Sequence, residues 1–106
     1  MKIAVCDDDS QELERISSLI DTYKRKSKVP LTCNTFQSAT ALISSMGSGD
    51  YDILLMDILM PGINGMQAAR EIRAFDAGVK IVFLTASPEF AVESYAVKAY
   101  DYILKP

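Results

Sequence analysis

Three acidic residues stand directly after short apolar runs, where carboxylates are able to do chemistry. Asp57 follows the run 53–56, and Asp7 and Asp8 follow the predicted strand 2–6. Four apolar residues bounded by turn signals predict a strand buried on both faces, and carboxylates are seldom buried without a partner. In an open α/β sheet, ligands bind beyond the carboxyl ends of the strands. If the first and third strands are neighbours, the three acids converge, and their mutual repulsion predicts a divalent metal ion.

Two further polar side chains follow predicted strands. Thr85 comes after the strand 79–84, and Lys105 comes after the strand 100–104. The carboxyl ends of parallel strands share one edge of a sheet. We therefore expect a hydroxyl and an ammonium group at the same edge as the acids, on two more strands.

Predicted strands and helices alternate along the chain and form one domain over residues 1–106. This alternation predicts a parallel sheet with right-handed crossovers and helices on both faces. The predicted strands are 2–6, 31–36, 53–56, 79–84 and 100–104, and the predicted helices are 10–26, 39–46, 66–73 and a less periodic segment 90–97.

The ends of the predicted helices carry capping signals. Asp9 and Glu12 have the spacing of a capping box, which explains Asp9 without a role as a third metal ligand. Ser38 is the predicted N-cap of the second helix, and Gly47 and Gly49 are expected to end it.

The composition excludes several classes of function. The chain is 49% hydrophobic over 106 residues, which is ordinary usage for one packed domain. It has no histidine, so it cannot use Ser-His-Asp catalysis, histidine-ligated zinc or a phosphohistidine of its own. It also lacks the glycine-rich nucleotide-binding motifs. A net charge of −3 argues against direct nucleic-acid contact by this domain.

Hydropathy and cysteine usage suggest an intracellular protein. No apolar run approaches the roughly 20 residues needed to cross a bilayer, and the N-terminus does not resemble a signal peptide. We expect a cytoplasmic location without membrane contact. Cys6 and Cys33 fall in the first two predicted strands, where a free cysteine behaves as a small buried hydrophobe.

As an ordered set, these motifs resemble the receiver domain of two-component response regulators. The resemblance covers essentially the whole chain and implies the flavodoxin-like strand order 2-1-3-4-5. The residues that carry it are Asp7-Asp8, Asp57, Met60-Pro61-Gly62, Gly65, Thr85-Ala86 and Lys105-Pro106.

The resemblance also implies a role for each acid. Asp57 would accept a phosphoryl group, Asp8 and Asp57 would ligate Mg²⁺, and Asp7 would hold the ion through water. The backbone carbonyl of Leu59 would complete the protein ligands, and Lys105 would supply a second cation. Mg²⁺ prefers octahedral oxygen ligands and keeps several waters, so few carboxylates suffice.

Thr85 and Tyr102 are the predicted switch residues. In receivers, the threonine bonds the phosphoryl group and an aromatic residue on the fifth strand reorients with it; Tyr102 has the matching position, three residues before Lys105. The alternative for Tyr102 is a partly buried core tyrosine with its hydroxyl in water.

A narrower resemblance concerns the segments 87–95 and 99–106. They are similar to receivers joined to LytTR-type DNA-binding domains, so any transcriptional role would belong to a longer parent protein. Receivers also continue past the Lys-Pro pair into a final helix, which this sequence lacks. We expect a fragment that forms homodimers or swaps elements, because an uncovered apolar face promotes association.

Three functions remain open from the sequence. The first is a receiver that takes its phosphoryl group from a sensor histidine kinase. The second is an aspartyl-phosphate phosphohydrolase similar to the haloacid dehalogenase group, which needs a second acid where Leu59 stands. The third is a receiver-like interaction module without phosphorylation, which the complete set of acids, Thr85 and Lys105 argues against.

Overall fold

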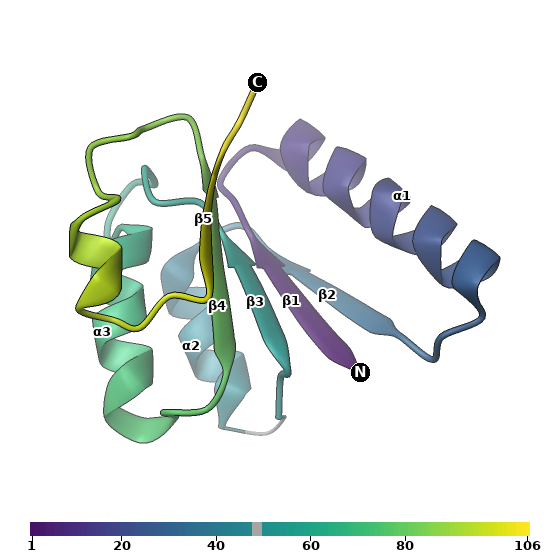
Figure 1. Cartoon of the computed structure of the whole chain (residues 1–106), viewed down its shortest axis with the longest axis horizontal. Coiled ribbons are helices and arrows are strands. Elements are labelled where there is room, and N and C mark those ends of the chain that lie inside the picture. The colour runs from purple at the N-terminus through teal and green to yellow at the C-terminus, as the bar shows by residue number, and fades with distance from the viewer. Residues whose placement is uncertain (48–49) are drawn as a thin grey trace.

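One parallel sheet of five strands forms the centre of the computed structural model, which describes residues 1–47 and 50–106 (Figure 1). The strand order is β2-β1-β3-β4-β5, as the resemblance implied. Gly49, expected to help end the second helix, lies outside the described residues. The strands are β1 (Lys2–Cys6), β2 (Thr32–Phe36), β3 (Ile53–Met56), β4 (Lys80–Thr85) and β5 (Asp101–Leu104).

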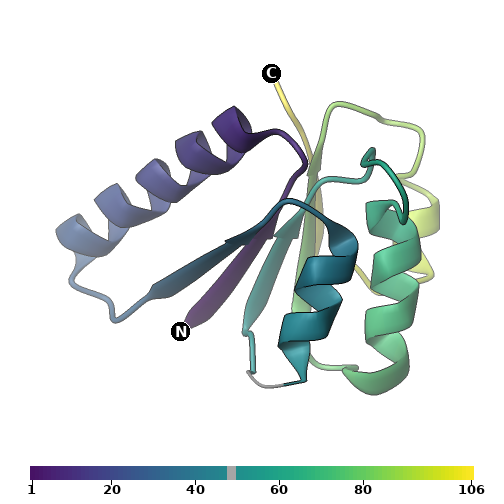
Figure 2. The same ribbon diagram turned by 180° about the vertical axis from the view of Figure 1, so that it is seen from behind.

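Helices cover both faces of the sheet, but unequally. Figures 1 and 2 show α1 (Ser10–Ser27) alone on one face, while α2 (Ala39–Met46) and α3 (Gly65–Phe75) lie on the other. The alternation of side chains along the strands divides the core accordingly. Leu54 packs toward α2 and α3 in the larger cluster, whereas Val5 packs toward α1 in the smaller one.

The prediction that β3 is fully buried on both faces is wrong. Leu54 and Met56 are 0% exposed beneath α2 and α3, but Ile53 and Leu55 are only half-buried on the face of α1. One helix is too narrow to cover that whole face. The α1 face therefore keeps an apolar groove beside β5.

A fourth regular helix does not form between residues 90 and 97. The structure has only a 3₁₀ turn there, η1 (Glu93–Tyr95). The apolar residues of the segment do not share a face, since Val92 is 81% exposed while Val97 is 2% exposed. Without one continuous apolar stripe, packing does not stabilise a longer helix.

Helix capping is partly as predicted. The Asp9 carboxylate accepts hydrogen bonds from the backbone N–H groups of Gln11 and Glu12 at the start of α1. The predicted capping box is only half formed, because the Glu12 side chain pairs with Arg15 instead of the Asp9 backbone. Within the described residues, no helix has both the length and the apolar character required to span a membrane.

A complete capping box stands at α3, where the sequence analysis did not predict one. Gln67 N–H donates to Asn64 Oδ1 at 2.8 Å, and Asn64 N–H donates to Gln67 Oε1 at 3.0 Å. The Asn-x-x-Gln spacing was the available signal. This box fixes the direction in which α3 leaves the loop after Asp57.

Replacement of Asn64 by alanine is expected to lower the free energy of unfolding by about 1 kcal/mol, because the first turn of α3 loses its cap. Urea denaturation followed by circular dichroism measures the change. Ser18→Ala, an exchange at an exposed site within α1, is the control and should leave stability nearly unchanged. Equal stability of Asn64→Ala and the native chain would contradict the role of the box.

Candidate functional site

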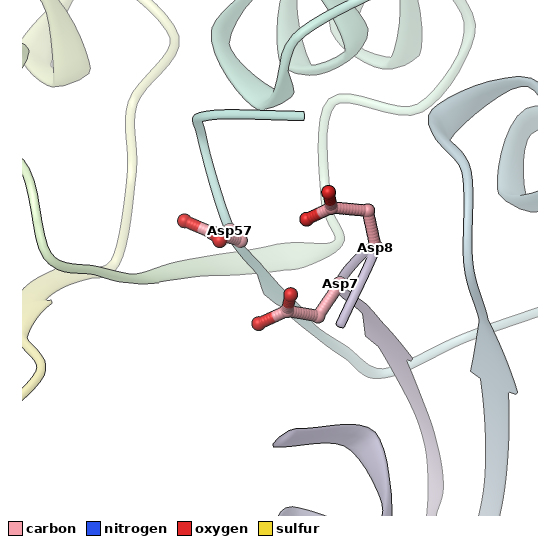
Figure 3. A group of neighbouring side chains, drawn as sticks. All are labelled: Asp7, Asp8 and Asp57. Atoms are coloured by element: carbon pink, nitrogen blue, oxygen red, sulfur yellow. The ribbon is translucent and has the colours of Figure 1, made fainter. Parts of the chain in front are cut away.

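Asp7, Asp8 and Asp57 meet at the carboxyl end of the sheet. Strands β1 and β3 are neighbours with Cys6 opposite Met56, so the acids that follow them are held together. The Asp57 N–H donates to the Cys6 carbonyl at 2.9 Å and extends this pairing into the site. One oxygen from each of the three carboxylates lies within 4.8 Å of the others (Figure 3). The predicted convergence of the acids is confirmed.

The three acids differ in exposure. Asp7 is 2% exposed and Asp57 is 9% exposed, whereas Asp8 is open to solvent. Burial raises the pKa of Asp7 above its usual range, although hydrogen bonds from Lys105 and from the Asp9 backbone oppose the shift. The site therefore has a buried floor and an open rim, a shape that suits a ligand entering from solvent.

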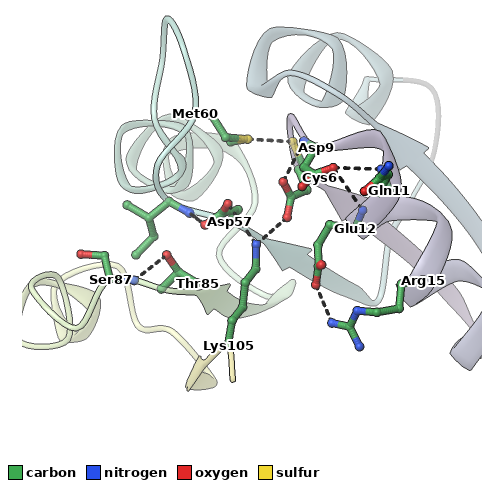
Figure 4. A network of polar contacts seen from close by, with 12 residues as sticks. Cys6, Asp9, Gln11, Glu12, Arg15, Asp57, Met60, Thr85, Ser87 and Lys105 are labelled. Carbon is green, nitrogen blue, oxygen red and sulfur yellow. Dashed lines mark hydrogen bonds and ion pairs between the residues drawn. The ribbon is translucent and has the colours of Figure 1, made fainter.

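Lys105 is the cation of this site. Its Nζ lies 2.8 Å from Asp7 Oδ2 and 3.2 Å from Asp57 Oδ2 (Figure 4). Burial alone would lower the pKa of Lys105, but the hydrogen bond to Asp7 and the charge of Asp57 outweigh it and raise that pKa. Sequence reasoning placed Lys105 near Asp57 but did not predict its contact with Asp7. One ammonium group cannot balance three carboxylates, so the site favours a further cation.

The loop after Asp57 is held close to the acid by its own backbone. Asp57 Oδ1 accepts a hydrogen bond from Ile58 N–H at 2.8 Å, and Gly65 N–H donates to the Ile58 carbonyl at 2.8 Å. Gly62 has φ of +76°, which a residue with a side chain rarely adopts. A Cβ on Gly65 would lie 2.1 Å from the Asp57 carbonyl oxygen. The turn therefore needs glycine at both positions.

Thr85 and Tyr102 both contact Ser87. Thr85 is 0% exposed and its Oγ1 accepts a hydrogen bond from Ser87 N–H at 3.3 Å. Tyr102 is partly buried against the core, as its alternative interpretation had it, but its hydroxyl donates to the Ser87 carbonyl and is not left to water. Its ring packs on Phe83 with centroids 6.0 Å apart. Nothing in the sequence pattern marks Ser87 as a contact of both residues, apart from its place two residues after Thr85.

A buried sulfur pair joins the loop to β1. Cys6 Sγ lies 3.8 Å from Met60 Sδ, and both residues are less than 9% exposed. Burial, followed by the charges of Asp7 and Asp57, raises the pKa of Cys6 to about 12. Cys6 and Cys33 are both free, as predicted. Met60 thus anchors the loop beside Asp57 through packing, a role that its sequence position alone did not indicate.

Leu59 lies on the open side of the loop. Its side chain is 55% exposed two residues after Asp57. An aspartyl-phosphate phosphohydrolase would require a second acid at this position, and Leu59 is not an acid. The use of the Leu59 carbonyl as a metal ligand stays a prediction.

Comparison with known proteins relates the chain to signalling regulators. A family model described as response regulator receiver domain matches residues 3–106. The positive alginate biosynthesis regulatory protein of Pseudomonas aeruginosa is 32% identical over all 106 residues, which are 42% of its own length. The transcriptional regulatory protein NatR of Bacillus subtilis is 30% identical, and the chain covers 44% of it. The chain thus spans less than half the length of these relatives.

Solved structures share the same fold. The response regulatory domain of protein MrkE from Klebsiella pneumoniae superimposes with a TM-score of 0.87 at 30% identity, covering 100% of this chain and 84% of that one. The response regulator TrrA from Thermotoga maritima, solved in complex with Mg(2+)-BeF, has a TM-score of 0.77 at 30% identity. That alignment covers 99% of this chain and 86% of TrrA.

Replacement of Gly65 by alanine is expected to lower the free energy of unfolding by about 1 to 3 kcal/mol, because the added Cβ overlaps the Asp57 backbone. Gly47→Ala is the matched control, since a Cβ there meets no atom within 4 Å. Urea denaturation of both variants measures the difference. Equal stabilities would show that the loop accommodates a side chain at residue 65.

Proposed function

Because this chain belongs to the family of response regulator receiver domains, it is a phospho-accepting signalling domain, and we propose that Asp57 is the acceptor. The observation that carries the proposal is the position of Asp57 beside Lys105, within a cluster that contains two further acids. Its carboxylate is 9% exposed, so a donor reaches it only from the open rim.

The donor set at this site fits Mg²⁺. The carboxylates of Asp7, Asp8 and Asp57 are hard oxygen ligands, and their shared charge exceeds what Lys105 balances. Asp8 and Asp57 would bind the ion directly, Asp7 would hold it through water, and the Leu59 carbonyl would complete the protein ligands. The bound ion would neutralise charge on the incoming phosphoryl group.

In the proposed reaction, a carboxylate oxygen of Asp57 attacks the phosphorus of a phosphohistidine on a sensor histidine kinase. The new O–P bond forms as the P–N bond breaks, and the imidazole leaves with the electron pair. Lys105 lies close enough to Asp57 to stabilise negative charge on the phosphoryl oxygens. Since these 106 residues contain no histidine, the donor histidine lies outside them.

Thr85 and Tyr102 are the proposed readout of phosphorylation. Thr85 Oγ1 now accepts a hydrogen bond from Ser87 N–H, and a phosphoryl group on Asp57 would offer the Thr85 O–H a strong acceptor. Movement of the Thr85 hydroxyl toward the phosphoryl group would lengthen its contact with Ser87 N–H, and the Ser87 carbonyl in turn accepts from the Tyr102 hydroxyl. We expect Tyr102 to reorient together with the segment after Thr85.

The parent protein is proposed to be a DNA-binding transcriptional regulator of the LytTR type, located in the cytoplasm. Support comes from the segments 87–95 and 99–106 and from relatives such as NatR, a transcriptional regulatory protein. This domain itself carries a net charge of −3, so DNA contact is assigned to another part of the parent protein.

Self-association is proposed to use the apolar groove on the α1 face. The groove encloses about 650 Å³ between α1 and the strands. Leu19, Tyr23 and Leu104 line it and are each more than half exposed. Covering this groove by a second copy, as a dimer or by exchange of elements, would remove that apolar surface from water.

Incubation with Mg²⁺ and acetyl phosphate is expected to add one phosphoryl group to the native chain and none to Asp57→Asn. Intact mass spectrometry measures the addition, and removal of Mg²⁺ with a chelator should abolish it. Asp50→Asn is the control, because Asp50 is exposed and precedes β3, at the opposite end of that strand from Asp57. Phosphate on both Asp57 proteins, or on neither, contradicts the assignment of Asp57.

Sedimentation velocity is expected to detect dimers of the native chain that become fewer in Ile103→Glu, since this change places a charge in the groove. Val92→Glu is the control, because Val92 is 81% exposed and does not line the groove. A native chain that stays monomeric at high concentration argues against self-association.

A further inference from the structure

The connection from β4 to β5 has little regular structure of its own. Between Thr85 and Asp101 it contains the short turn η1, and Lys98, near its end, has φ of +52°. Figures 1 and 2 both show this connection running beside α3. Segments of this kind depend on contacts with neighbouring elements for their position.

Arg73 of α3 supplies those contacts to the end of the connection. Its Nε donates to the Val97 carbonyl at 2.7 Å, and Nη2 donates to the Lys98 carbonyl at 3.1 Å. The remaining Nη1 donates to the carbonyl of Asp76, the C-cap of α3, at 3.2 Å. One guanidinium thus binds the C-cap carbonyl of α3 and two carbonyls of the turn that follows η1. The carbonyls at the end of α3 lack partners within the helix and carry partial negative charge.

A second arginine one turn earlier adds a weaker contact. Arg70 forms an ion pair with Glu93 at the start of η1, and both side chains are about half exposed. An exposed pair of this kind contributes little on its own. The backbone contacts of Arg73, together with the buried Val97 side chain, therefore attach residues 93–98 to α3 more firmly than this ion pair does.

Helix α3 also contacts the loop beside Asp57. Gly65, its first residue, donates to the Ile58 carbonyl, directly after the acid. The other end of the β4–β5 connection is Ser87, which Thr85 and Tyr102 both hold. The same helix is thus joined to the proposed phosphorylation site and to the segment that the proposed switch would move.

We propose that Arg73 is a positioning residue of the switch. It holds residues 93–98 against α3 in the unphosphorylated arrangement, and it opposes the change to the arrangement that accompanies phosphorylation. This inference rests on the proposed phosphorylation of Asp57. A contact made only in the resting state lowers the population of the phosphorylation-competent state. A contact that merely stabilised the fold would favour both states equally, and its loss would not change the rate of phosphorylation.

Arg73→Ala is expected to raise the initial rate of phosphorylation by acetyl phosphate and Mg²⁺ by about fivefold, the lower range of typical coupling between sites. Intact mass spectrometry measures the rate. Hydrogen exchange should become faster in peptides covering residues 93–100, where the carbonyl contacts are lost. Arg73→Lys should change both readouts in the same direction but less, because an ammonium group lacks the guanidinium fork.

Arg25→Ala is the matched control, since Arg25 forms an exposed pair with Asp21 on α1 and should leave both readouts unchanged. If the native chain accepts no phosphate, the proposed function fails and this inference fails with it. If the native chain is phosphorylated and folded Arg73→Ala reacts no faster, the inference alone is overturned. Should Arg73→Ala not fold, Arg73→Lys is judged by the same criterion.

Discussion

Repulsion among three carboxylates is the constraint on which the rest of this structure depends. Strands β1 and β3 bring Asp7, Asp8 and Asp57 together, and two of these acids are almost completely buried. Concentrating like charges at low exposure costs free energy unless cations offset it. Lys105 offsets part of the cost in the structure, and the open rim beside Asp8 leaves room for a second cation. Backbone hydrogen bonds at Ile58 and Asp9 stabilise the buried oxygens further.

Much of this site was predictable because parallel strands place their carboxyl ends at one edge. Three polar residues stand directly after apolar runs, and this was enough to expect that they lie close together: Asp57, Thr85 and Lys105. The strand order and the pair β1–β3 then made the acids converge. Local pattern and global fold agree at these positions, which is typical of sequences that specify a single structure.

The rest depended on contacts between residues distant in sequence. A lysine side chain is long and flexible, so the pattern could not decide that Lys105 would bind Asp7 as well as Asp57. Arg73 reaches carbonyls 24 and 25 residues away, and nothing local to α3 indicates them. The helix expected over residues 90–97 does not form for a related reason. Tertiary contacts determine the burial of each apolar residue there separately, and these residues do not form one continuous apolar stripe.

Lys105 also has a mechanical consequence for the sheet. It follows β5, an edge strand that pairs with β4 alone among the described residues, yet its ammonium group binds acids that follow β3 and β1. The side chain therefore reaches past the end of β4, and its two ion pairs join the edge of the sheet to its interior. Any ligand that changes the charge at Asp57 or Asp7 changes the strength of these ion pairs. The position of the edge strand, which carries Tyr102, is thus coupled to the charge at the acidic site.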